Sequence, residues 1–419
     1  MPNHEGGTVM GESPGRRPTV VLLGTLDTKG REYAFVREHI TARGVDVLLI
    51  DAGILGDPLT EPDITRQEVA AAAGADVQDL ADAGDRGAAI EGMGRGVTEI
   101  VLRLQAEGRL DAIGALGGTG GTTLATHAMR ALPVGVPKLM VSTVASGDTS
   151  PYVGTVDMTM MYSVVDVAGI NRVSAQILVN AAGTLVGMAT APKLPLDEAR
   201  PLVAASMWGV TTPCVTTARE RLEEHGYDVL VFHQTGTGGD SMEALIRTGL
   251  VEGVLDVTPT ELVGELAGGV WPAGRERLEV AGRLGIPQVV SLGGLDLIAL
   301  GPPDSMPDQF RSRWIYRHDE HMAAARTTAE ESASLARVIA RKLNAATGPV
   351  ALFVPLRGFS PLSTPGADFH DAEADAALVD GLRELIDPSR VELHEVECDI
   401  NDPELAIAMA ERLYELMAG

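Results

Sequence analysis

The sequence predicts an α/β protein made of two Rossmann-like three-layer subdomains, each built on a mainly parallel sheet. Two observations carry this prediction. Short uninterrupted apolar runs alternate with amphipathic segments, and the alternation restarts after a polar, proline-rich break at residues 191–201. Apolar runs of this kind are typical of strands buried on both faces, and strand–helix–strand order requires parallel pairing. With 419 residues, 45% of them hydrophobic, the chain is long enough for two cores.

The first subdomain is expected over residues 18–195, after a leader at residues 1–17 that is polar, aperiodic and expected to be disordered. The apolar run at residues 20–23 is bounded by a glycine and predicts the first strand. An amphipathic helix follows at residues 32–43 and ends at the next glycine. The other elements expected in this half are strands at residues 45–50, 110–116 and 138–141 and a helix at residues 122–131.

The second subdomain is expected over residues 202–419, where the same alternation resumes. Its predicted strands are residues 202–207, 227–232, 288–292, 350–354 and 391–396. Its predicted helices are residues 216–225, 241–247, 327–344 and 402–417.

Charge and composition exclude several classes of partner. The 33 Lys and Arg against 58 Asp and Glu give a net charge of −25, and no basic run interrupts it, so we expect neither nucleic-acid nor anionic-membrane binding. No apolar stretch reaches the roughly 18 residues of a membrane helix, and no secretory signal pattern opens the chain. Cys214 and Cys398 are too few for a disulfide framework, so we expect a cytoplasmic protein.

The loop after the first predicted strand, GTLDTKG at residues 24–30, suits an anion and its metal. In parallel sheets, ligands lie beyond the carboxyl ends of strands, where helix N-termini offer free N–H groups. The loop supplies flexible backbone, hydroxyls, a carboxylate and an ammonium. The residues predicted to bind are Gly24, Thr25, Asp27, Thr28 and Lys29. The alternative is an ordinary βα turn in which Asp27 or Thr28 caps the helix.

A second loop, GGTGGTT at residues 117–123, is the sharper signal, because four glycines let the backbone approach a bulky anion. The predicted binding residues are Gly117, Gly118, Thr119, Gly120, Gly121 and Thr122. The alternative is close packing of helix on strand. The loop matches neither the P-loop nor G-x-G-x-x-G, so it indicates phosphate binding without naming a nucleotide.

Three further strand-end loops add candidates. Ser146, Gly147 and Asp148 follow the strand at residues 138–141 and are predicted to reach ribose, phosphate or a cation. In the second half, the residues predicted to bind the cofactor are Gly236, Thr237, Gly238 and Gly239. His233 precedes them and is the acid/base candidate, with an ordinary hydrogen-bonded histidine as the alternative. Arg357 is predicted to clamp a carboxylate or phosphate.

Two patterns are not taken as sites. The run His318-Asp319-Glu320-His321 is short, charged and without a further ligand at diagnostic spacing, so no dedicated metal site is expected. Neither cysteine has a local histidine and acid, so no thiol nucleophile is expected.

Taken together, the motifs resemble the ATP-binding family typified by the tomato mosaic virus resistance protein, over nearly the whole chain from about residue 19 to 418. The motifs are GTLDTKG from Gly24, LGGTGGTTLATHAMRALPVGVPKLMVST from Leu116, ASGDTSPYVGTVDMTMMYSVVD from Ala145, GINRVSAQILVNAAG from Gly169, GVTTPCV from Gly209, VFHQTGTGGDSMEALI from Val231, ARTT from Ala325, PLRGFS from Pro355 and DINDPELA from Asp399. Two positions depart from the family pattern: Asp319-Glu320 replaces an Asn-Pro pair after the histidine, and Asp399 replaces a histidine.

The resemblance implies two α/β subdomains, binding of ATP with magnesium, and self-association as a homodimer, but no reaction. Plant relatives carry an additional barrel-like domain after this region, so a separate barrel-fold protein is an expected partner.

The function expected is therefore an ATP-binding protein of small-molecule metabolism, a transferase, ligase or hydrolase that transfers a phosphoryl group or uses ATP for activation in a cleft between the subdomains. The amides of residues 117–123 and Lys29 would neutralise phosphate, Asp27 or Asp148 would hold magnesium, and His233 or Arg357 would act on a second substrate.

Two alternatives stay open. One is a nucleotide-sensing regulatory subunit that docks on a barrel enzyme. The other is a C–C bond lyase, a hydrolase or a dehydrogenase in the same cleft. Asp51 ends the second strand where a ribose-binding acid would stand, but the absence of G-x-G-x-x-G disfavours NAD.

Overall fold

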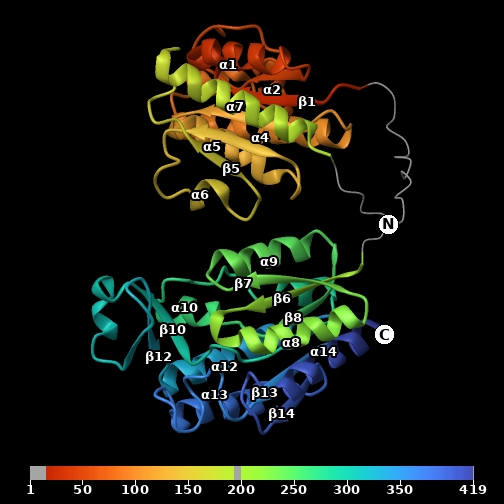
Figure 1. Cartoon of the computed structure of the whole chain (residues 1–419), viewed down its shortest axis with the longest axis vertical. Coiled ribbons are helices and arrows are strands. Elements are labelled where there is room, and N and C mark those ends of the chain that lie inside the picture. Colours follow the sequence, from red (N-terminus) through yellow and green to blue (C-terminus); the bar gives the residue numbers. More distant parts are fainter. Residues whose placement is uncertain (1–15, 193–199, 419) are drawn as a thin grey trace, which may run out of the picture. The chain divides into compact units, whose positions relative to one another are not determined.

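The computed structural model of the chain describes residues 16–192 and 200–418. It divides into two compact units, Met1–Leu194 and Pro195–Gly419, each described here by itself (Figure 1). Most of the expected leader and of the polar break lies outside the described residues. Of the leader, Arg16 and Arg17 are described, and Arg16 donates a hydrogen bond to Thr19 Oγ1 at 2.9 Å.

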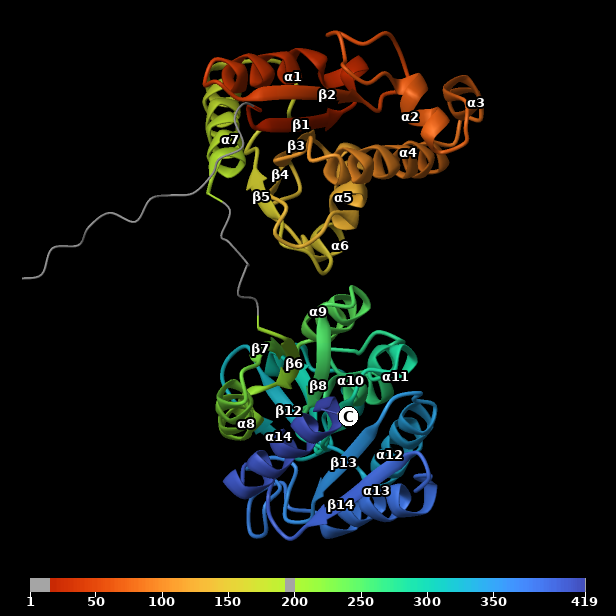
Figure 2. The ribbon, with the colours of Figure 1, turned by 90° about the vertical axis from the view of Figure 1, so that its right-hand side faces the viewer.

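The N-terminal unit is a three-layer α/β structure. Within residues 16–192, its five parallel strands follow the order β2-β1-β3-β4-β5 (Figure 2). They are β1 Thr19–Gly24, β2 Asp46–Asp51, β3 Ala112–Gly117, β4 Lys138–Ser142 and β5 Thr159–Tyr162. The helices are α1 Leu26–Thr41, α2 Arg66–Ala72, α3 Val77–Asp82, α4 Arg86–Ala106, α5 Thr119–Ala131, α6 Ser150–Val153 and α7 Arg172–Thr190.

Alternation along the buried strands builds two cores, one on each face of this sheet. In β1, Val20 and Leu22 pack with α1 and α7, whereas Val21 and Leu23 pack with α2, α4 and α5. Among the described helices, α7 is the one long and apolar enough to cross a membrane by length and composition. Its buried residues, such as Leu178 and Leu185, belong to the first of these cores.

The C-terminal unit repeats the architecture. Within residues 200–418, six parallel strands follow the order β14-β13-β9-β8-β6-β7, beside an antiparallel sheet β10-β12-β11. The strands are β6 Leu202–Met207, β7 Asp228–His233, β8 Val251–Asp256, β9 Gln288–Val290, β10 Leu297–Gly301, β11 Ile315–Arg317, β12 Ala323–Arg326, β13 Val350–Pro355 and β14 Val391–Val396. The helices are α8 Thr212–Glu224, α9 Thr237–Arg247, α10 Glu261–Ala267, α11 Val280–Leu284, α12 Ala329–Asn344, α13 Ala372–Leu385 and α14 Pro403–Ala418, and three short 3₁₀ turns join them at Gly209–Thr211, Pro303–Ser305 and Asp308–Phe310.

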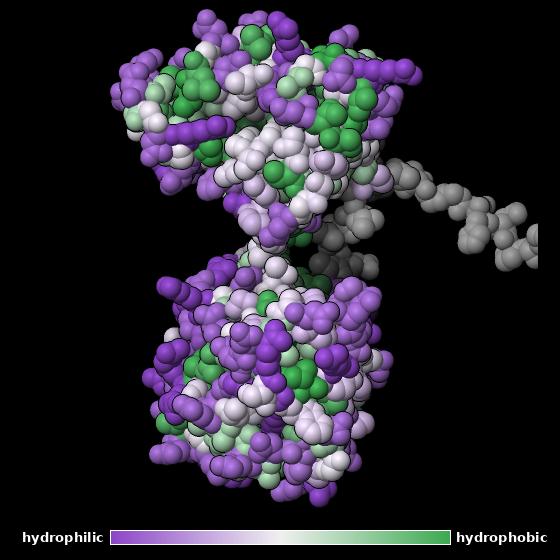
Figure 3. All heavy atoms as spheres, turned by 90° about the vertical axis from the view of Figure 1, so that its left-hand side faces the viewer, coloured by the Kyte–Doolittle hydropathy of each residue, from purple (hydrophilic) through white to green (hydrophobic). Residues whose placement is uncertain are grey.

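The predicted fold class, two α/β subdomains with mainly parallel sheets, is confirmed. On the face drawn in Figure 3, hydrophilic and hydrophobic residues are interspersed on both units. Four predicted helix starts were wrong, because helices α1, α5, α8 and α9 begin three to six residues before the predicted positions, whereas α12 and α14 begin within two residues of theirs. Thr25 and Gly118, for example, already have the extended backbone of an N-cap, so that the residues after them form helix and not loop.

Candidate functional site

A cavity of about 870 Å³ opens at the carboxyl edge of the sheet in the N-terminal unit. It is lined by the segments that follow β1, β2 and β3 and by the first turns of α1, α4 and α5. The lining residues are Thr25, Asp27, Thr28, Lys29, Ala52, Ile54, Leu55, Leu80, Ala81, Gly84, Asp85, Arg86, Ala89, Ile90, Met93, Gly117, Gly118, Thr119, Gly120, Gly121, Thr123, Leu124 and Asp166. The two glycine-containing segments predicted separately from the sequence therefore share one cavity.

The position of this cavity follows from the strand order. The chain runs from β1 to β2 on one side and then returns to β3 on the other side of β1. Helix α1 packs on one face of the sheet and α5 on the opposite face. The order 2-1-3-4-5 places its switch point between β1 and β3, which is where open α/β sheets bind ligands.

Tyr33 holds β1 and β3 together at the floor of this crevice. Its hydroxyl donates to the carbonyl of Leu23, the last β1 residue paired with β3, at 2.5 Å and accepts from Leu116 N, just after the last paired residue of β3, at 2.7 Å. Burial raises the pKa of Tyr33, so the hydroxyl stays a donor. A Cβ on Gly24 would stand 2.2 Å from the Tyr33 ring, so packing explains this glycine. Gly24 is predicted to bind ligand, but it does not line the cavity.

The first turn of α1 brings the polar residues of GTLDTKG to the cavity. Thr25 is the N-cap, and its hydroxyl lies 2.8 Å from the hydroxyl of Thr28. Lys29 Nζ lies 3.9 Å from Asp166 Oδ1, and the two side chains are 19% and 69% exposed. Because the distance is long and Asp166 is mostly exposed, this ion pair is weak, and the ammonium of Lys29 can still bind a ligand in the cavity.

Asp27 is buried in the wall, with its side chain 4% exposed. Its Oδ2 accepts from Leu55 N at 2.8 Å and lies 3.9 Å from Arg66 Nη1. Its Oδ1 is buried and has no hydrogen-bond partner within the described part of the chain. Such an orphan carboxylate oxygen is costly unless a cation or a donor completes it.

Asp51, the candidate ribose-binding acid of a dehydrogenase, is engaged with the protein itself. It is 1% exposed, and its Oδ1 accepts from Leu26 N at 3.1 Å and Gly53 N at 2.9 Å. Its Oδ2 accepts from Arg66 Nε at 2.7 Å. Asp51 therefore ties β2 to α1 and α2 and does not line the cavity.

Gly118 and Gly121, at the start of α5, are not explained by packing. A Cβ on Gly118 would meet its nearest atom, Thr143 Oγ1, at 3.6 Å, and one on Gly121 would meet Leu116 O at 3.7 Å, both ordinary contacts. Gly118 has φ −85°, which any residue adopts, and it supplies no side chain to cap the helix. The free N–H groups of the first turn of α5 thus border the cavity without a capping side chain.

Thr122 has a structural role. It is fully buried, and its hydroxyl donates to Gly118 O at 2.8 Å and lies 2.7 Å from Ser142 Oγ. It fixes the start of α5 to the end of β4, and Thr123 lines the cavity in its place.

The predicted Ser146, Gly147 and Asp148, which follow β4, do not line the cavity, whereas Asp166, which follows β5, does. Asp148 accepts from Ser150 N at 3.0 Å and Ser150 Oγ at 2.6 Å, and these bonds lower its pKa.

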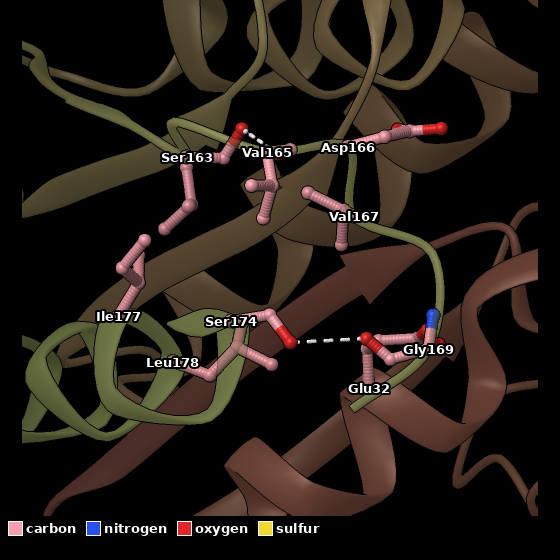
Figure 4. A pocket seen from close by; sticks show the side chains of 10 residues that line it. Glu32, Ser163, Val165, Asp166, Val167, Gly169, Ser174, Ile177 and Leu178 are labelled. Carbon is pink, nitrogen blue, oxygen red and sulfur yellow. Dashed lines mark hydrogen bonds between the residues drawn. The ribbon is translucent and has the colours of Figure 1, made fainter. Parts of the chain in front are cut away.

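Figure 4 shows how the loop that carries Asp166 is held beside α1 and α7. Gly169 N donates to the buried Glu32, and Ser174 Oγ donates to Gly169 O at 3.0 Å. Ser163 Oγ donates to Val165 O at 2.7 Å. The Asp166 side chain points away from this small pocket.

The glycine segment of the C-terminal unit is built differently. The N–H groups of Gly236 and Gly239, at the start of α9, donate to Glu261 Oε1 at 2.6 and 3.1 Å. A Cβ on Gly238 would stand 1.7 Å from His233 O, and one on Gly239 would stand 1.8 Å from Glu261 Oε2. Packing therefore explains both glycines, and a carboxylate of the chain already occupies the N-terminus at which Gly236, Thr237, Gly238 and Gly239 were predicted to bind a cofactor.

Arg277 holds that carboxylate in place. The fully buried guanidinium donates to Glu261 Oε2 at 3.0 Å, Asp256 Oδ1 at 2.8 Å and Gln234 Oε1 at 3.0 Å. Glu243 Oε1 lies 3.6 Å away. Burial raises the pKa of Glu243 and of Glu261, and the arginine works against that shift.

His233 ends β7 and Arg357 follows β13, so both belong to the C-terminal unit and are exposed. Neither side chain lines the cavity described above. Across residues 16–192 and 200–418, no three His, Cys, Asp or Glu side chains form a group that could hold a metal.

Comparison with known proteins places the chain in a family. Residues 18–194 match the N-terminal domain of the uncharacterised protein family UPF0261, and residues 200–417 match its C-terminal domain. A UPF0261 protein of Clostridium tetani is 48% identical over 95% of this chain and 98% of its own length, and one of Mesorhizobium japonicum is 41% identical over 93% and 97%. The tomato ToMV resistance protein Tm-1 is 35% identical over 97% of this chain but only 57% of its own length.

Among solved structures, a UDP-N-acetylglucosamine 2-epimerase from Rickettsia bellii is 11% identical with a TM-score of 0.23, covering 61% of this chain and 77% of its own. MurG from Acinetobacter baumannii is 12% identical with a TM-score of 0.25, covering 96% and 92%. Likenesses of this size carry no functional argument. On the sequence matches, the chain belongs to the UPF0261 family, together with the tomato Tm-1 protein.

Proposed function

We propose that the N-terminal unit binds ATP, together with Mg²⁺, in the cavity between the ends of β1 and β3. One observation carries the proposal: two segments chosen from the sequence for phosphate binding line one cavity of about 870 Å³ at the switch point of a parallel sheet. Two helix N-termini, those of α1 and α5, open onto it. Their free amides suit the phosphate chain.

The rest of the lining suits a nucleoside. One wall of the cavity is apolar. Helices α3 and α4 contribute Leu80, Ile90 and Met93 to this wall, and Ile54 and Leu124 extend it. Ligand sites commonly join such an apolar wall to a few polar groups that fix orientation. In our proposal, the base packs on the apolar wall, while Gly118, Gly121 and Lys29 meet the phosphates.

The donor set also fits magnesium. Mg²⁺ usually keeps several waters and takes one or two carboxylates plus substrate phosphates, so a three-carboxylate cage is not needed. Asp27 has a buried oxygen without a partner in the described residues, and Asp166 adds a second carboxylate to the lining. Of the two acids expected to hold the ion, Asp27 is therefore favoured over Asp148. Bound Mg²⁺ would neutralise charge on the phosphates.

Phosphoryl transfer or ATP-dependent activation of a small molecule is the proposed reaction. Within the unit, Lys29 and the α5 amides would stabilise charge that develops on the phosphate oxygens. His233 and Arg357, expected to act on a second substrate, belong to the C-terminal unit. Because no histidine of the described residues lines the cavity, a second candidate is a nucleotide-sensing subunit, with a separate barrel-fold protein as its partner.

Calorimetric titration of the whole chain with ATP, ADP and NAD, with and without Mg²⁺, tests the proposal. Lys29→Ala should weaken Mg²⁺-dependent ATP binding, whereas Arg43→Ala, an exposed change just beyond the other end of α1, should not. Absence of ATP binding by the unaltered protein would refute the function. Phosphate release by the chain alone would favour transfer, and binding without turnover would favour sensing.

A further inference from the structure

We infer that Arg86 binds the phosphate chain of the nucleotide and makes the cavity select ligands by the number of their phosphates. It lines the cavity and is the first residue of α4, just after the N-cap Asp85. Asp85 Oδ1 accepts from Ala88 N at 3.0 Å, which fixes the backbone from which Arg86 projects. The inference rests on the proposed function and names a group that sequence patterns did not single out.

The Arg86 side chain reaches across to α5. Its Nη2 lies 3.2 Å from the position that a Cβ on Gly120 would take, and Ile90 Cδ1 is the next atom at 3.5 Å. A side chain at position 120 would therefore crowd the guanidinium. Alanine at position 120 would require the flexible guanidinium to shift by a few tenths of an ångström, whereas alanine at position 118 or 121 would make only ordinary contacts. The guanidinium stands beside the first turn of α5, where the phosphates are proposed to bind.

Within the described residues, the Arg86 guanidinium has no hydrogen bond or ion pair from the protein. Two other arginines of the N-terminal unit are paired: on the same helix, Arg95 Nη1 donates to Glu91 Oε1 at 2.8 Å, and the buried Arg66 pairs with Asp51. A guanidinium has several N–H donors in a planar fork that matches phosphate oxygens two at a time. Arg86 is therefore available for such an acceptor within the cavity.

The cations and helix ends indicate the class of ligand. Arg86 from α4 and Lys29 from α1 contribute two positive charges, and two helix N-termini add partial positive charge. The lining also carries three carboxylates, Asp27, Asp85 and Asp166, whose charge a bound Mg²⁺ would offset. With the metal present, the cations and helix ends favour an organic polyphosphate over a monophosphate or a neutral nucleoside. The contact with Arg86 should thus strengthen the binding of ligands with two or three phosphates more than the binding of ligands with one.

The test compares ATP, ADP, AMP and inorganic tripolyphosphate by calorimetry on the full chain with Mg²⁺, for Arg86→Gln, Arg86→Lys and the control Arg95→Gln. We expect Arg86→Gln to weaken ATP and tripolyphosphate binding about tenfold or more, the size of a lost charge-assisted hydrogen bond, and AMP binding much less. Arg86→Lys should restore part of the loss, and Arg95→Gln should change nothing. The melting temperature of Arg86→Gln should match that of the unaltered protein, because no protein contact is lost.

Two results overturn the inference alone: ATP binding by Arg86→Gln equal to that of Arg95→Gln, or equal losses for ATP and AMP. Failure of the unaltered protein to bind any of the four ligands overturns the proposed function as well.

Discussion

Two glycines in similar sequence surroundings should respond in opposite ways to alanine. Gly121 lies in the first turn of α5 and Gly239 in the first turn of α9. A methyl group at position 121 would meet only Leu116 O at an ordinary 3.7 Å. Alanine favours a helix over glycine by up to about 1 kcal/mol, so Gly121→Ala should stabilise the N-terminal unit by about 0.5–1 kcal/mol. This corresponds to a rise of roughly 1–4 °C in melting temperature for a unit of this size.

At position 239 the methyl group would stand 1.8 Å from Glu261 Oε2 and 2.9 Å from Arg277 Nε. The carboxylate would have to leave both the α9 amides and the arginine. Breaking a buried, hydrogen-bonded ion pair costs about 3–5 kcal/mol, so Gly239→Ala should lower the melting temperature of the C-terminal unit by roughly 6–20 °C.

Ligand binding separates the two glycines further. Gly121→Ala should weaken ATP binding about tenfold, a loss of about 1.4 kcal/mol, because the added methyl group occupies the cavity wall. Gly183→Ala is the matched control: this glycine lies in α7, nothing stands within 4 Å of its Cβ position, and it lines no part of the cavity. It should stabilise the unit equally and leave binding intact.

Scanning calorimetry gives the melting temperatures, with hydrogen exchange of α5 and α9 peptides assigning each transition to its unit. A destabilised Gly121→Ala, or one that is stabilised but binds ATP normally, would refute the assignment of this glycine to a ligand. A stable Gly239→Ala would show that Glu261 does not cap α9 in the way described.

Three further outcomes are expected. Tyr33→Phe should cost about 1–3 kcal/mol of unfolding free energy in urea, because the buried N–H of Leu116 loses its acceptor. Arg277→Met should destabilise the C-terminal unit by about 3–5 kcal/mol, since it leaves buried carboxylates unpaired, and an unchanged urea midpoint would contradict this. Burial, only partly offset by Arg326, raises the pKa of Asp375 to about 6 from an ordinary 3.8, so the folded chain binds this proton more tightly. The stability that it contributes is lost as pH rises from about 4 to about 6, and Asp375→Asn should flatten that part of the urea midpoint against pH.

Most strands were predictable because they are short apolar runs, a property of the local sequence, whereas β5, β8, β10, β11 and β12 were not predicted. Strands β6 and β14 have the predicted bounds. Helix starts were not predictable in the same way, because Gly120 and Gly121 are poor helix formers and the extended N-cap at Gly118 is set by the end of β3. Helix propensity predicts a helix start poorly where a buried strand fixes the position at which the chain enters the helix.

The candidate site was predicted in part for a related reason. Lys29 and Gly118 follow strand ends, so local order alone placed them at one edge of the sheet. Arg86 reaches the cavity from a helix that carries no recognisable motif, and Asp166, although it ends the motif that starts at Ala145, is brought there by tertiary packing. Equally, the sequence around Gly239 does not predict that Glu261, the first residue of α10, accepts hydrogen bonds from the start of α9.

The two glycine segments together argue for an external anion in the N-terminal unit. Both sheets have their first strand between the second and the third, and both units place a glycine-rich helix start at the carboxyl edge. Such a start concentrates free N–H groups, which favour negative charge. In the C-terminal unit the chain supplies that charge itself, through Glu261 held by Arg277. In the N-terminal unit the start of α5 has no side-chain cap, borders a cavity of about 870 Å³ and lies beside Arg86. Within the described residues, no carboxylate of the chain binds these N–H groups or the Arg86 guanidinium. An anionic ligand would supply the negative charge that Glu261 supplies in the C-terminal unit.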